Sequence, residues 1–419
     1  MKLLQHSEGQ GMTTILACRI CQKGKLHKFL SLGSIPLANS FLRQDQLGVP
    51  EPYYPLDVCF CSNCGLVQLA QVVDPEIMFK DYVYQTGTSP PLKEHFAKLA
   101  ETTIQKFKIP EGSFVMDIGS NDGTLLENFQ KHGMRVLGID PARNIAELAL
   151  SRGIDTLIDF FNKNLVSKIR KGYGKPSVVF ATNIFAHIHK LDDFVGAVNS
   201  LIADDGVFII EVPYLVDMLR KVEFDTIYHE HLSYFAVRPL TTLFDKFGMG
   251  IADVEQISIH GGSIRIYVQK SLHSLPPSVI ELFNLETEAR IDSLATYQKF
   301  AEDTSRIREE LPLLLKALKG DGARIAGYGA PAKGNILLNY CKIGTDLLDY
   351  IIDATPFKQG QYTPGTHIPV FPESHFRKFQ PDYTLLLAWN YKDAILKKEH
   401  EYRQAGGKFI IPIPKPQIV

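Results

Sequence analysis

The sequence predicts an α/β protein with a small cysteine-rich domain at the N-terminus and two larger domains that each contain a parallel sheet. Two CxxC pairs lie near the start of the chain. Two later stretches alternate short apolar runs with longer helical periodicity, which is the pattern of strands and helices in a parallel sheet. Because 419 residues suffice for two or three domains, we expect domains over residues 12–74, 75–272 and 273–419. Met12 is an alternative start, so residues 1–11 are left outside the first domain.

The composition is that of an ordinary globular protein, with 45% apolar and 22% charged residues. The formal net charge of −1 gives no electrostatic attraction to nucleic acid or to an anionic membrane. No apolar run approaches the roughly 18 residues that span a bilayer, and the N-terminus lacks the apolar core of a signal peptide. We therefore expect a cytoplasmic protein with reduced thiols that binds neither nucleic acid nor a membrane.

The two CxxC pairs predict a metal site. Cys18 pairs with Cys21 and Cys61 with Cys64, and each spacing lets one tight turn aim two thiolates at a common point. Four such sulfur ligands are what a tetrahedral Zn²⁺ prefers, and a site filled by four cysteines is structural because it leaves no open position. The alternative is two disulfides or four unrelated thiols, which the absence of secretion signals disfavours. Cys59 is a spare thiol by this interpretation.

The middle part predicts a helix over residues 92–107, followed by strands in the runs FVMDIG, RVLGID, SVVFATN and VFIIEVP. It closes with GIADVEQIS and SIRIYVQ, where the second run is expected to return antiparallel to the first. The last part begins with one long helical stretch over residues 278–319. Strands are then expected in ARIAGYGA, LLDYIID, YTLLLAW and KFIIPIP, which predicts a second α/β sheet.

A glycine-rich turn after the first middle strand predicts a ligand site. Asp117 ends the strand, Gly119 and Gly123 permit a tight turn, and Asn121 supplies a polar edge. The spacing differs from the GxGxxG of dinucleotide-binding proteins. The turn is also acidic, which repels a pyrophosphate and attracts a cationic sulfonium.

Polar residues also follow the next three strands. Asp140 is placed to accept hydrogen bonds from ribose hydroxyls. Asp159 is placed to accept one from an adenine amino group, and Phe160 is placed to pack on the adenine ring. Asn183 follows the fourth strand. Four polar groups at successive strand ends suit the ligand edge of an open parallel sheet, although ordinary strand-end capping is the alternative for any one of them.

The motifs DIGSNDGTLL, GIDPA and ATNIFAHI resemble the class I S-adenosylmethionine-dependent methyltransferases. Together with the cysteine pairs, DYVYQTGTS, TIYHEHLSYF, HGGSIRIYV and GYGAPAKGN, the whole chain past Met12 resembles the nucleotide-sugar C-methyltransferases. That resemblance implies a zinc-binding domain, a central Rossmann-like methyltransferase domain and a C-terminal Rossmann-like domain. It also implies methylation of a sugar carbon beside a ketone.

The segment TIYHEHLSYF carries the catalytic candidates. Carbon methylation requires a carbanion, and a histidine is a suitable base for a hydrogen next to a ketone. The resemblance assigns the base to the second histidine of this motif, His231. Tyr228 and Glu230 are expected to orient the base or the sugar, and His187 to donate to the keto oxygen. His229 is expected to be structural.

Other residues are expected around the substrate. Tyr82 and Tyr84 lie in the entry segment, where they are expected to cap the cofactor and the sugar, with plain packing as the alternative. The turn at His260 is expected to face the site if the preceding strand runs parallel to the sheet. A glycine hairpin turn without a ligand is the equally weighted alternative.

The last part carries a second glycine-rich turn between a strand and a helix. The resemblance implies that this domain holds the diphosphate and base of a sugar nucleotide. Tyr328, Gly329, Lys333 and Asn335 are the expected contacts, since a helix N-terminus favours a phosphate. Structural glycines are one alternative, and a bound NAD with Asp353 on its ribose is another.

We therefore expect a C-methyltransferase that uses S-adenosylmethionine and acts on a nucleotide-linked 4-keto-deoxyhexose at C3, with a structural zinc. An RNA methyltransferase is one alternative, against which the neutral charge and the lack of NPPY or PC motifs argue. A scaffold that only binds nucleotides is the other alternative.

Overall fold

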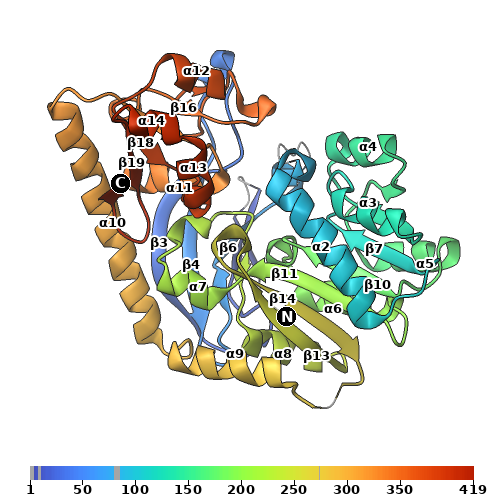
Figure 1. Cartoon of the computed structure of the whole chain (residues 1–419). Helices are drawn as coiled ribbons and strands as arrows, with labels where there is room; N and C mark the ends of the chain where they lie inside the picture. Colours follow the sequence, from blue (N-terminus) through green and yellow to red (C-terminus); the bar gives the residue numbers. More distant parts are fainter. Residues whose placement is uncertain (1–3, 8–10, 80–84, 273) are drawn as a thin grey trace.

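The computed structural model describes residues 4–7, 11–79, 85–272 and 274–419. Tyr82 and Tyr84 therefore lie outside the described residues. Figure 1 shows three parts around a common centre: the N-terminal strands in blue, a sheet covered by helices in cyan and green, and a C-terminal part in red. A long orange helix runs along one flank and leads into the C-terminal part. The predicted three-part α/β architecture is confirmed.

The N-terminal part holds two antiparallel sheets. The smaller sheet has the order β1-β2-β6 and the larger one β12-β5-β4-β3. Their members, with the short helices between them, are β1 (Leu4–Ser7), β2 (Met12–Ile15), β3 (Leu26–Pro36), η1 (Gln44–Gln46), β4 (Tyr53–Cys61), β5 (Val67–Leu69), β6 (Gln71–Val73) and α1 (Pro75–Phe79). The edge strand β12 (Ser233–Tyr234) comes from the middle of the chain and pairs antiparallel with β5. The N-terminal sheet is thus completed by residues of the predicted catalytic motif itself.

The middle sheet has the order β13-β14-β11-β10-β7-β8-β9 among the described residues. Only β14 runs against the others, so β13 points in the same direction as β11. Its strands are β7 (Phe114–Ile118), β8 (Arg135–Ile139), β9 (Thr156–Leu157), β10 (Val178–Thr182), β11 (Val207–Pro213), β13 (Met249–Ile257) and β14 (Ser263–Lys270). The turn between β13 and β14 therefore lies at the same edge as the carboxyl ends of the parallel strands.

The strands β7, β10 and β11 are buried almost throughout, as expected for a sheet with helices on both faces. The helices of this part are η2 (Thr86–Thr88), α2 (Pro90–Phe107), α3 (Thr124–Lys131), α4 (Arg143–Ser151), α5 (Lys163–Gly172), η3 (Phe185–His187), α6 (Leu191–Leu201), α7 (Leu215–Arg220), η4 (Phe224–Thr226), α8 (Val237–Asp245) and η5 (Ile259–Gly261). Figure 1 shows α2 and α3 covering one face of this sheet.

The C-terminal sheet has the order β17-β16-β15-β18-β19-β20, parallel except for β20. Its strands are β15 (Ile325–Tyr328), β16 (Ile351–Ile352), β17 (Val370–Phe371), β18 (Tyr383–Leu386), β19 (Lys408–Ile411) and β20 (Gln417–Ile418). Its helices are α11 (Ala332–Cys341), η6 (Pro356–Lys358), α12 (Glu373–Lys378), η7 (Trp389–Tyr391), α13 (Lys392–Lys398) and α14 (His400–Gln404).

The single helix expected over residues 278–319 is two helices, α9 (Pro277–Glu288) and α10 (Leu294–Gly320). Arg290 adopts a left-handed φ of 51°, which ends the first helix. The buried carboxylate of Glu286 accepts from the backbone of Val237 at 2.6 Å and Arg238 at 3.2 Å, which fixes the end of α9 against α8. The second helix then packs Tyr297 against the rings of the N-terminal sheet.

Candidate active site and metal centre

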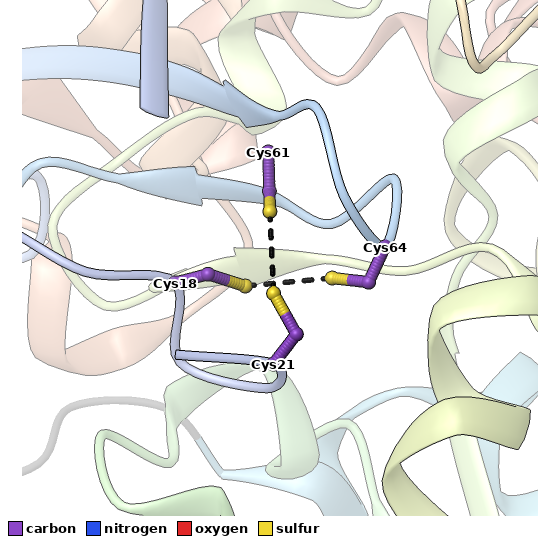
Figure 2. Close-up of side chains that lie close together, drawn as sticks. All are labelled: Cys18, Cys21, Cys61 and Cys64. Atoms are coloured by element: carbon purple, nitrogen blue, oxygen red, sulfur yellow. Dashed lines mark hydrogen bonds between the residues drawn. The ribbon is translucent and has the colours of Figure 1, made fainter. Parts of the chain in front are cut away.

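The two CxxC turns bring four thiols together. The Sγ atoms of Cys18, Cys21, Cys61 and Cys64 lie within 4.8 Å of one another, and Figure 2 shows the four side chains converging on one point from two separate turns. The Cys18–Cys64 and Cys21–Cys61 sulfur distances are 3.4 and 3.5 Å. A tetrahedral Zn²⁺ with bonds of about 2.3 Å separates its sulfurs by about 3.8 Å. The cluster therefore fits a closed, structural zinc site.

Cys59 does not belong to this cluster. It sits on β4 two residues before Cys61, and it is buried in the N-terminal sheet. Burial raises the pKa of its thiol to about 11, so it stays protonated at neutral pH. The interpretation of Cys59 as a spare thiol agrees with this position.

A cavity of ≈ 720 Å³ opens at the carboxyl ends of the middle strands. Its far wall belongs to the C-terminal part, through residues of the loop before α11 and the segment after β18, and Asn39 contributes from the N-terminal part. Twelve of the predicted site residues line it: Asp117, Gly119, Asn121, Asp140, Asp159, Phe160, Asn183, His187, Tyr228, His231, His260 and Lys333. The cavity thus lies between the two α/β sheets.

The acidic turn after β7 lines this cavity. Gly119 and Asn121 adopt positive φ values of 73° and 51°, which make the chain turn sharply. Asp117 is buried, and its Oδ1 has no hydrogen-bond partner among the described residues. Burial, together with Asp140 and Glu211, raises the pKa of Asp117 well above its usual value. An unpartnered carboxyl group on a cavity wall suits a cationic ligand, as the sequence predicts.

The other predicted cofactor contacts follow the neighbouring strands. Asp140 accepts from the backbone of Asn121 at 2.8 Å and of Ala142 at 2.9 Å, so its carboxylate also stabilises the turns beside it. Asp159 accepts from the backbone of Phe160 at 2.7 Å, and the Phe160 ring is 41% exposed on the cavity rim. These positions fit a ribose and a flat base, since carboxylate oxygens can accept further hydrogen bonds.

The predicted base sits in a defined hydrogen-bond chain. Nδ1 of His231 lies 2.9 Å from the Thr226 carbonyl oxygen, which can only accept. The proton is therefore on Nδ1, and Nε2 accepts from the Tyr228 hydroxyl at 2.8 Å. Burial lowers the pKa of His231 well below its usual value. The His231 imidazole is therefore neutral. Its Nε2 lone pair faces Tyr228, which lines the cavity, and this nitrogen can take up a proton.

A second neutral histidine lies beside it. The ring centroids of His187 and His231 are 5.2 Å apart, and His187 stacks on Phe79. Burial lowers the pKa of His187 to about 4. Because a neutral imidazole carries one N–H, His187 is able to donate a hydrogen bond into the cavity.

The C-terminal part contributes two lysines to the cavity lining. Lys333 donates to the His260 carbonyl at 3.0 Å and lies 3.8 Å from Glu223. Lys358 is buried, donates to the Ala330 carbonyl at 2.8 Å and also lines the cavity. Burial raises the pKa of Glu223 to about 7, so this acid only partly offsets the charge of Lys333. Lys358 lies 3.9 Å from Asp353. The cavity lining therefore combines acidic and basic groups.

Five predicted site residues do not line the cavity. The hydroxyl of Tyr328 donates to Glu399 at 2.8 Å inside the C-terminal core, and Asn335 donates to the Ala38 carbonyl at 2.6 Å. Gly123 and Gly329 have positive φ, and a Cβ on either would meet a packed side chain, which is a structural reason for glycine. Glu230 accepts from the cavity residue Asn39 at 2.7 Å. The structure thus places these five behind the cavity lining, and their predicted roles toward a ligand stay predictions.

Sequence reasoning missed several buried polar groups near the cavity. Glu211 is fully buried on β11 and bonds His95 of α2 at 2.8 Å and Arg265 of β14 at 2.6 Å. The sequence did carry a signal for Glu211, because it is a charged residue inside the apolar run VFIIEVP. Lys358 ends the short helix η6 in a mixed polar stretch of the sequence, so no local contrast indicated that it would be buried.

Three family models match consecutive stretches of the chain. They are described as "Putative zinc binding domain" over residues 18–79, "Methyltransferase domain" over residues 92–253 and "C-methyltransferase C-terminal domain" over residues 258–414. The chain is also 37% identical over 404 residues to C-methyltransferase NovU of Streptomyces niveus, which covers 96% of each protein.

The chain belongs to this family of C-methyltransferases. The predicted family, the S-adenosylmethionine-dependent methyltransferase domain and the zinc-binding domain are confirmed at this level. The domain boundaries and the roles of the site residues stay predictions. No helix in the described part of the chain is long and apolar enough to cross a membrane.

Solved structures match part of the chain at lower similarity. One is the magnesium protoporphyrin IX methyltransferase ChlM of Synechocystis PCC 6803, which is 13% identical with a TM-score of 0.33 and covers 43% of this chain and 79% of that chain. Another is an S-adenosylmethionine-dependent methyltransferase of Clostridium acetobutylicum, 12% identical with a TM-score of 0.35, covering 43% of this chain and 92% of that chain.

Replacing Asp117 with asparagine is expected to weaken S-adenosylmethionine binding about 10–100-fold, because a charged hydrogen bond contributes about 1.5–3 kcal/mol. The raised pKa of Asp117 means that the protonated acid must ionise to bind a cation. Cofactor affinity of the wild type should therefore rise with pH through the pKa of Asp117, with release of a proton. Calorimetry in buffers of different ionisation enthalpy measures both effects. An Asp117→Asn variant with unchanged affinity and an unchanged pH profile would contradict this role.

Proposed function

We propose that this C-methyltransferase transfers a methyl group to C3 of a nucleotide-linked 4-keto-deoxyhexose. The observation that carries the proposal is the set of groups that line one cavity. The acidic turn at Asp117, the Tyr228–His231 pair, Lys333 and Lys358 all face this space. This combination suits a cationic methyl donor, an acidic C–H bond and an anionic diphosphate.

The cofactor end is built from side chains of the middle sheet. S-adenosylmethionine supplies an electrophilic methyl group on a sulfonium when it is bound. Asp117 is placed to attract that positive charge, Asp140 to accept from ribose hydroxyls, and Phe160 to cover the adenine ring. These assignments follow the strand order and match the chemistry of each side chain.

His231 is the proposed general base. The Tyr228 hydroxyl, which donates to Nε2 at 2.8 Å, turns away to free the single lone pair of this nitrogen. Nε2 then takes the proton from C3 of the sugar, and the electron pair of the broken C–H bond moves onto the C3–C4–O4 enolate. S-adenosylmethionine, when bound, would supply the methyl group to the enolate carbon, and the electron pair of the methyl–sulfur bond would leave with S-adenosylhomocysteine. The contact between Nδ1 and the Thr226 carbonyl keeps Nε2 free of a proton before the step.

A histidine whose pKa is lowered is a weak base, so the enolate oxygen needs strong stabilisation. The neutral imidazole of His187 carries a donor next to His231, and Lys333 supplies a positive charge to the same cavity. Donors aimed at a developing oxyanion in a water-poor site contribute about 2.7–4 kcal/mol each. We assign the keto oxygen to His187, because its ring lies beside the base.

The substrate assignment rests on the half-buried Lys333 and the buried Lys358. Ammonium groups that lie at a helix N-terminus, as Lys333 does on α11, favour a phosphate. Wild-type enzyme should transfer a methyl group from S-adenosylmethionine to at least one nucleotide-linked 4-keto-deoxyhexose in a single-turnover assay read by mass spectrometry. Transfer to none of a panel that varies the base and the sugar stereochemistry would reject the proposed substrate class.

Replacing Lys333 with methionine is expected to raise KM for the sugar nucleotide about 10–100-fold, more than it lowers kcat, because the lost phosphate contact is the same in ground and transition states. The matched control is Lys316→Met on the exposed face of α10, which should change neither constant. Steady-state kinetics with saturating cofactor measure the split. A Lys333→Met variant with wild-type KM would leave the α11 turn a purely structural element.

A further inference from the structure

The turn of the first CxxC pair carries a buried arginine. Arg19 lies between Cys18 and Cys21, and it is 6% exposed. Its Nη1 donates to the carbonyl oxygens of Leu69 and Leu232, both at 2.9 Å. Its backbone nitrogen donates to the side chain of Gln68 at 2.8 Å. One guanidinium nitrogen thus joins the metal-binding turn to β5 and to a residue 213 positions away.

Leu232 is the residue directly after the proposed base. Its backbone nitrogen donates to the Ala186 carbonyl at 2.8 Å, next to His187. Its carbonyl accepts from Arg19 Nη1 and also from the backbone nitrogen of Leu69 at 3.0 Å. The peptide groups of Leu232 therefore join the His187 loop on one side and the cysteine-rich part on the other.

The chain after Leu232 continues this attachment. Residues 233 and 234 form β12, the edge strand of the N-terminal sheet, by pairing with β5. Among the described residues, the His231 imidazole bonds to Tyr228 and to the Thr226 carbonyl and lies beside the ring of His187. The two residues before it, His229 and Glu230, bond to Tyr54 and Asn39 of the N-terminal part. The segment that carries His231 is therefore held by the N-terminal part on both sides, and Leu232 is its attachment on the C-terminal side.

The electrostatics of the turn favour the arginine at this place. Burying a guanidinium is unfavourable unless hydrogen bonds and an opposite charge compensate it. Four thiolates around one Zn²⁺ carry a net negative charge, and Cys18 adjoins Arg19 in the chain. A filled zinc site therefore stabilises the buried cation whose donor reaches Leu232.

We propose that Arg19 is a positioning residue for the methyl transfer, which sets His231 against the C–H bond by holding the Leu232 carbonyl. The zinc turn then determines the geometry of the base as well as the stability of its own domain. This inference rests on the proposed role of His231. Because a displacement of about 1 Å can lower a rate about 10²-fold, loss of this contact should appear in kcat.

The test compares Arg19→Met, Arg19→Lys and the control Lys246→Met. Lys246 donates to the Ile20 carbonyl in the same turn at 2.7 Å and pairs with Asp192 at 2.6 Å, but it makes no contact with Leu232 among the described residues. Arg19→Met should lower kcat about 10–100-fold with KM within twofold and zinc content unchanged. Arg19→Lys should lie between Arg19→Met and the wild type, since the flexible, shorter lysine side chain keeps the donors but loses the rigid planar geometry of the guanidinium.

Lys246→Met should keep the wild-type kcat. An Arg19→Met enzyme within twofold of wild-type kcat would overturn the proposal, and so would equal losses in Arg19→Met and Lys246→Met. If Arg19→Met lost its zinc while Arg19→Lys kept the wild-type zinc content and kcat, Arg19 would be assigned to metal binding alone. That result would also overturn the proposal. If Arg19→Met does not fold, Arg19→Lys decides, and a wild-type kcat for that variant contradicts the inference.

A second measurement needs no substrate and therefore separates this inference from the proposed function. Long-range ¹⁵N–¹H spectra report the tautomer of each histidine ring. Wild-type His231 should give the neutral signal with the proton on Nδ1, and Arg19→Lys should shift or broaden it while Lys246→Met leaves it in place. An unchanged His231 signal in Arg19→Lys would contradict the positioning role even if the substrate class were wrong.

Discussion

Replacing His231 with alanine is expected to lower kcat about 10²–10⁴-fold, which is the usual contribution of a positioned general base. Cofactor binding should persist, because His231 lies on the segment before β12 and not on the turn at Asp117 that is proposed to hold the cofactor. Single-turnover methyl transfer and calorimetric binding of S-adenosylmethionine measure the two quantities. Turnover close to that of the wild type would remove His231 from the mechanism.

The matched control is His229→Ala in the same motif. The Nε2 of His229 lies 3.2 Å from the Tyr54 carbonyl, so this ring joins the segment to β4 and does not line the cavity. Its loss should lower the melting temperature with a much smaller effect on kcat. Equal losses of kcat in both variants would indicate that the motif only supports the fold.

Proton removal can also be followed without methyl transfer. In D₂O, with S-adenosylhomocysteine bound so that the cofactor end is filled, wild-type enzyme should exchange the C3 hydrogen of the substrate for deuterium. The His231→Ala variant should not exchange it above the uncatalysed rate. Exchange at the wild-type rate in His231→Ala would assign the base to another group.

Loss of zinc is expected to unfold the cysteine-rich part. A structural zinc contributes about 10–16 kcal/mol in small peptides, which is comparable with the whole stability of a typical domain, about 5–15 kcal/mol. Cys61→Ser should therefore abolish zinc binding and lower the yield of folded protein, because Cys61 is one of four converging ligands and is fully buried. Elemental analysis and thermal unfolding measure the two effects.

Cys59→Ser is the matched control, two residues away on the same strand. Its thiol is buried outside the cluster, so the variant should retain one zinc per chain and lose only packing energy. If Cys61→Ser kept its zinc and its melting temperature, or if Cys59→Ser lost zinc in the same way, the assignment of the four ligands would be wrong.

Local patterns in the sequence predicted most of the fold. The apolar runs before Gly119 and Asp140 are strands β7 and β8, and the CxxC turns meet as their spacing requires. These features depend on neighbouring residues, which is why they can be read from the chain. The break at Arg290 was missed because it depends on Glu286 binding the start of α8, a contact between segments about 50 residues apart.

The candidate site was predicted less completely for the same reason. Tyr328 and Asn335 were placed at the site by their position near a glycine-rich turn, but their side chains point to Glu399 and to Ala38. The side of a short strand or helix that faces the cavity is set by tertiary packing. The hydrogen bond from Arg19 to the Leu232 carbonyl joins residues 213 positions apart, and no local sequence pattern predicts it.

The position of the new methyl group tests the central claim most directly. Wild-type enzyme would be given S-adenosylmethionine with a ¹³C-labelled methyl group and a panel of nucleotide-linked 4-keto-deoxyhexoses, and the products would be examined by carbon NMR. The account predicts a labelled methyl carbon bonded to C3, next to the ketone. A label found on oxygen or nitrogen, or no labelled sugar from any member of the panel, would contradict it.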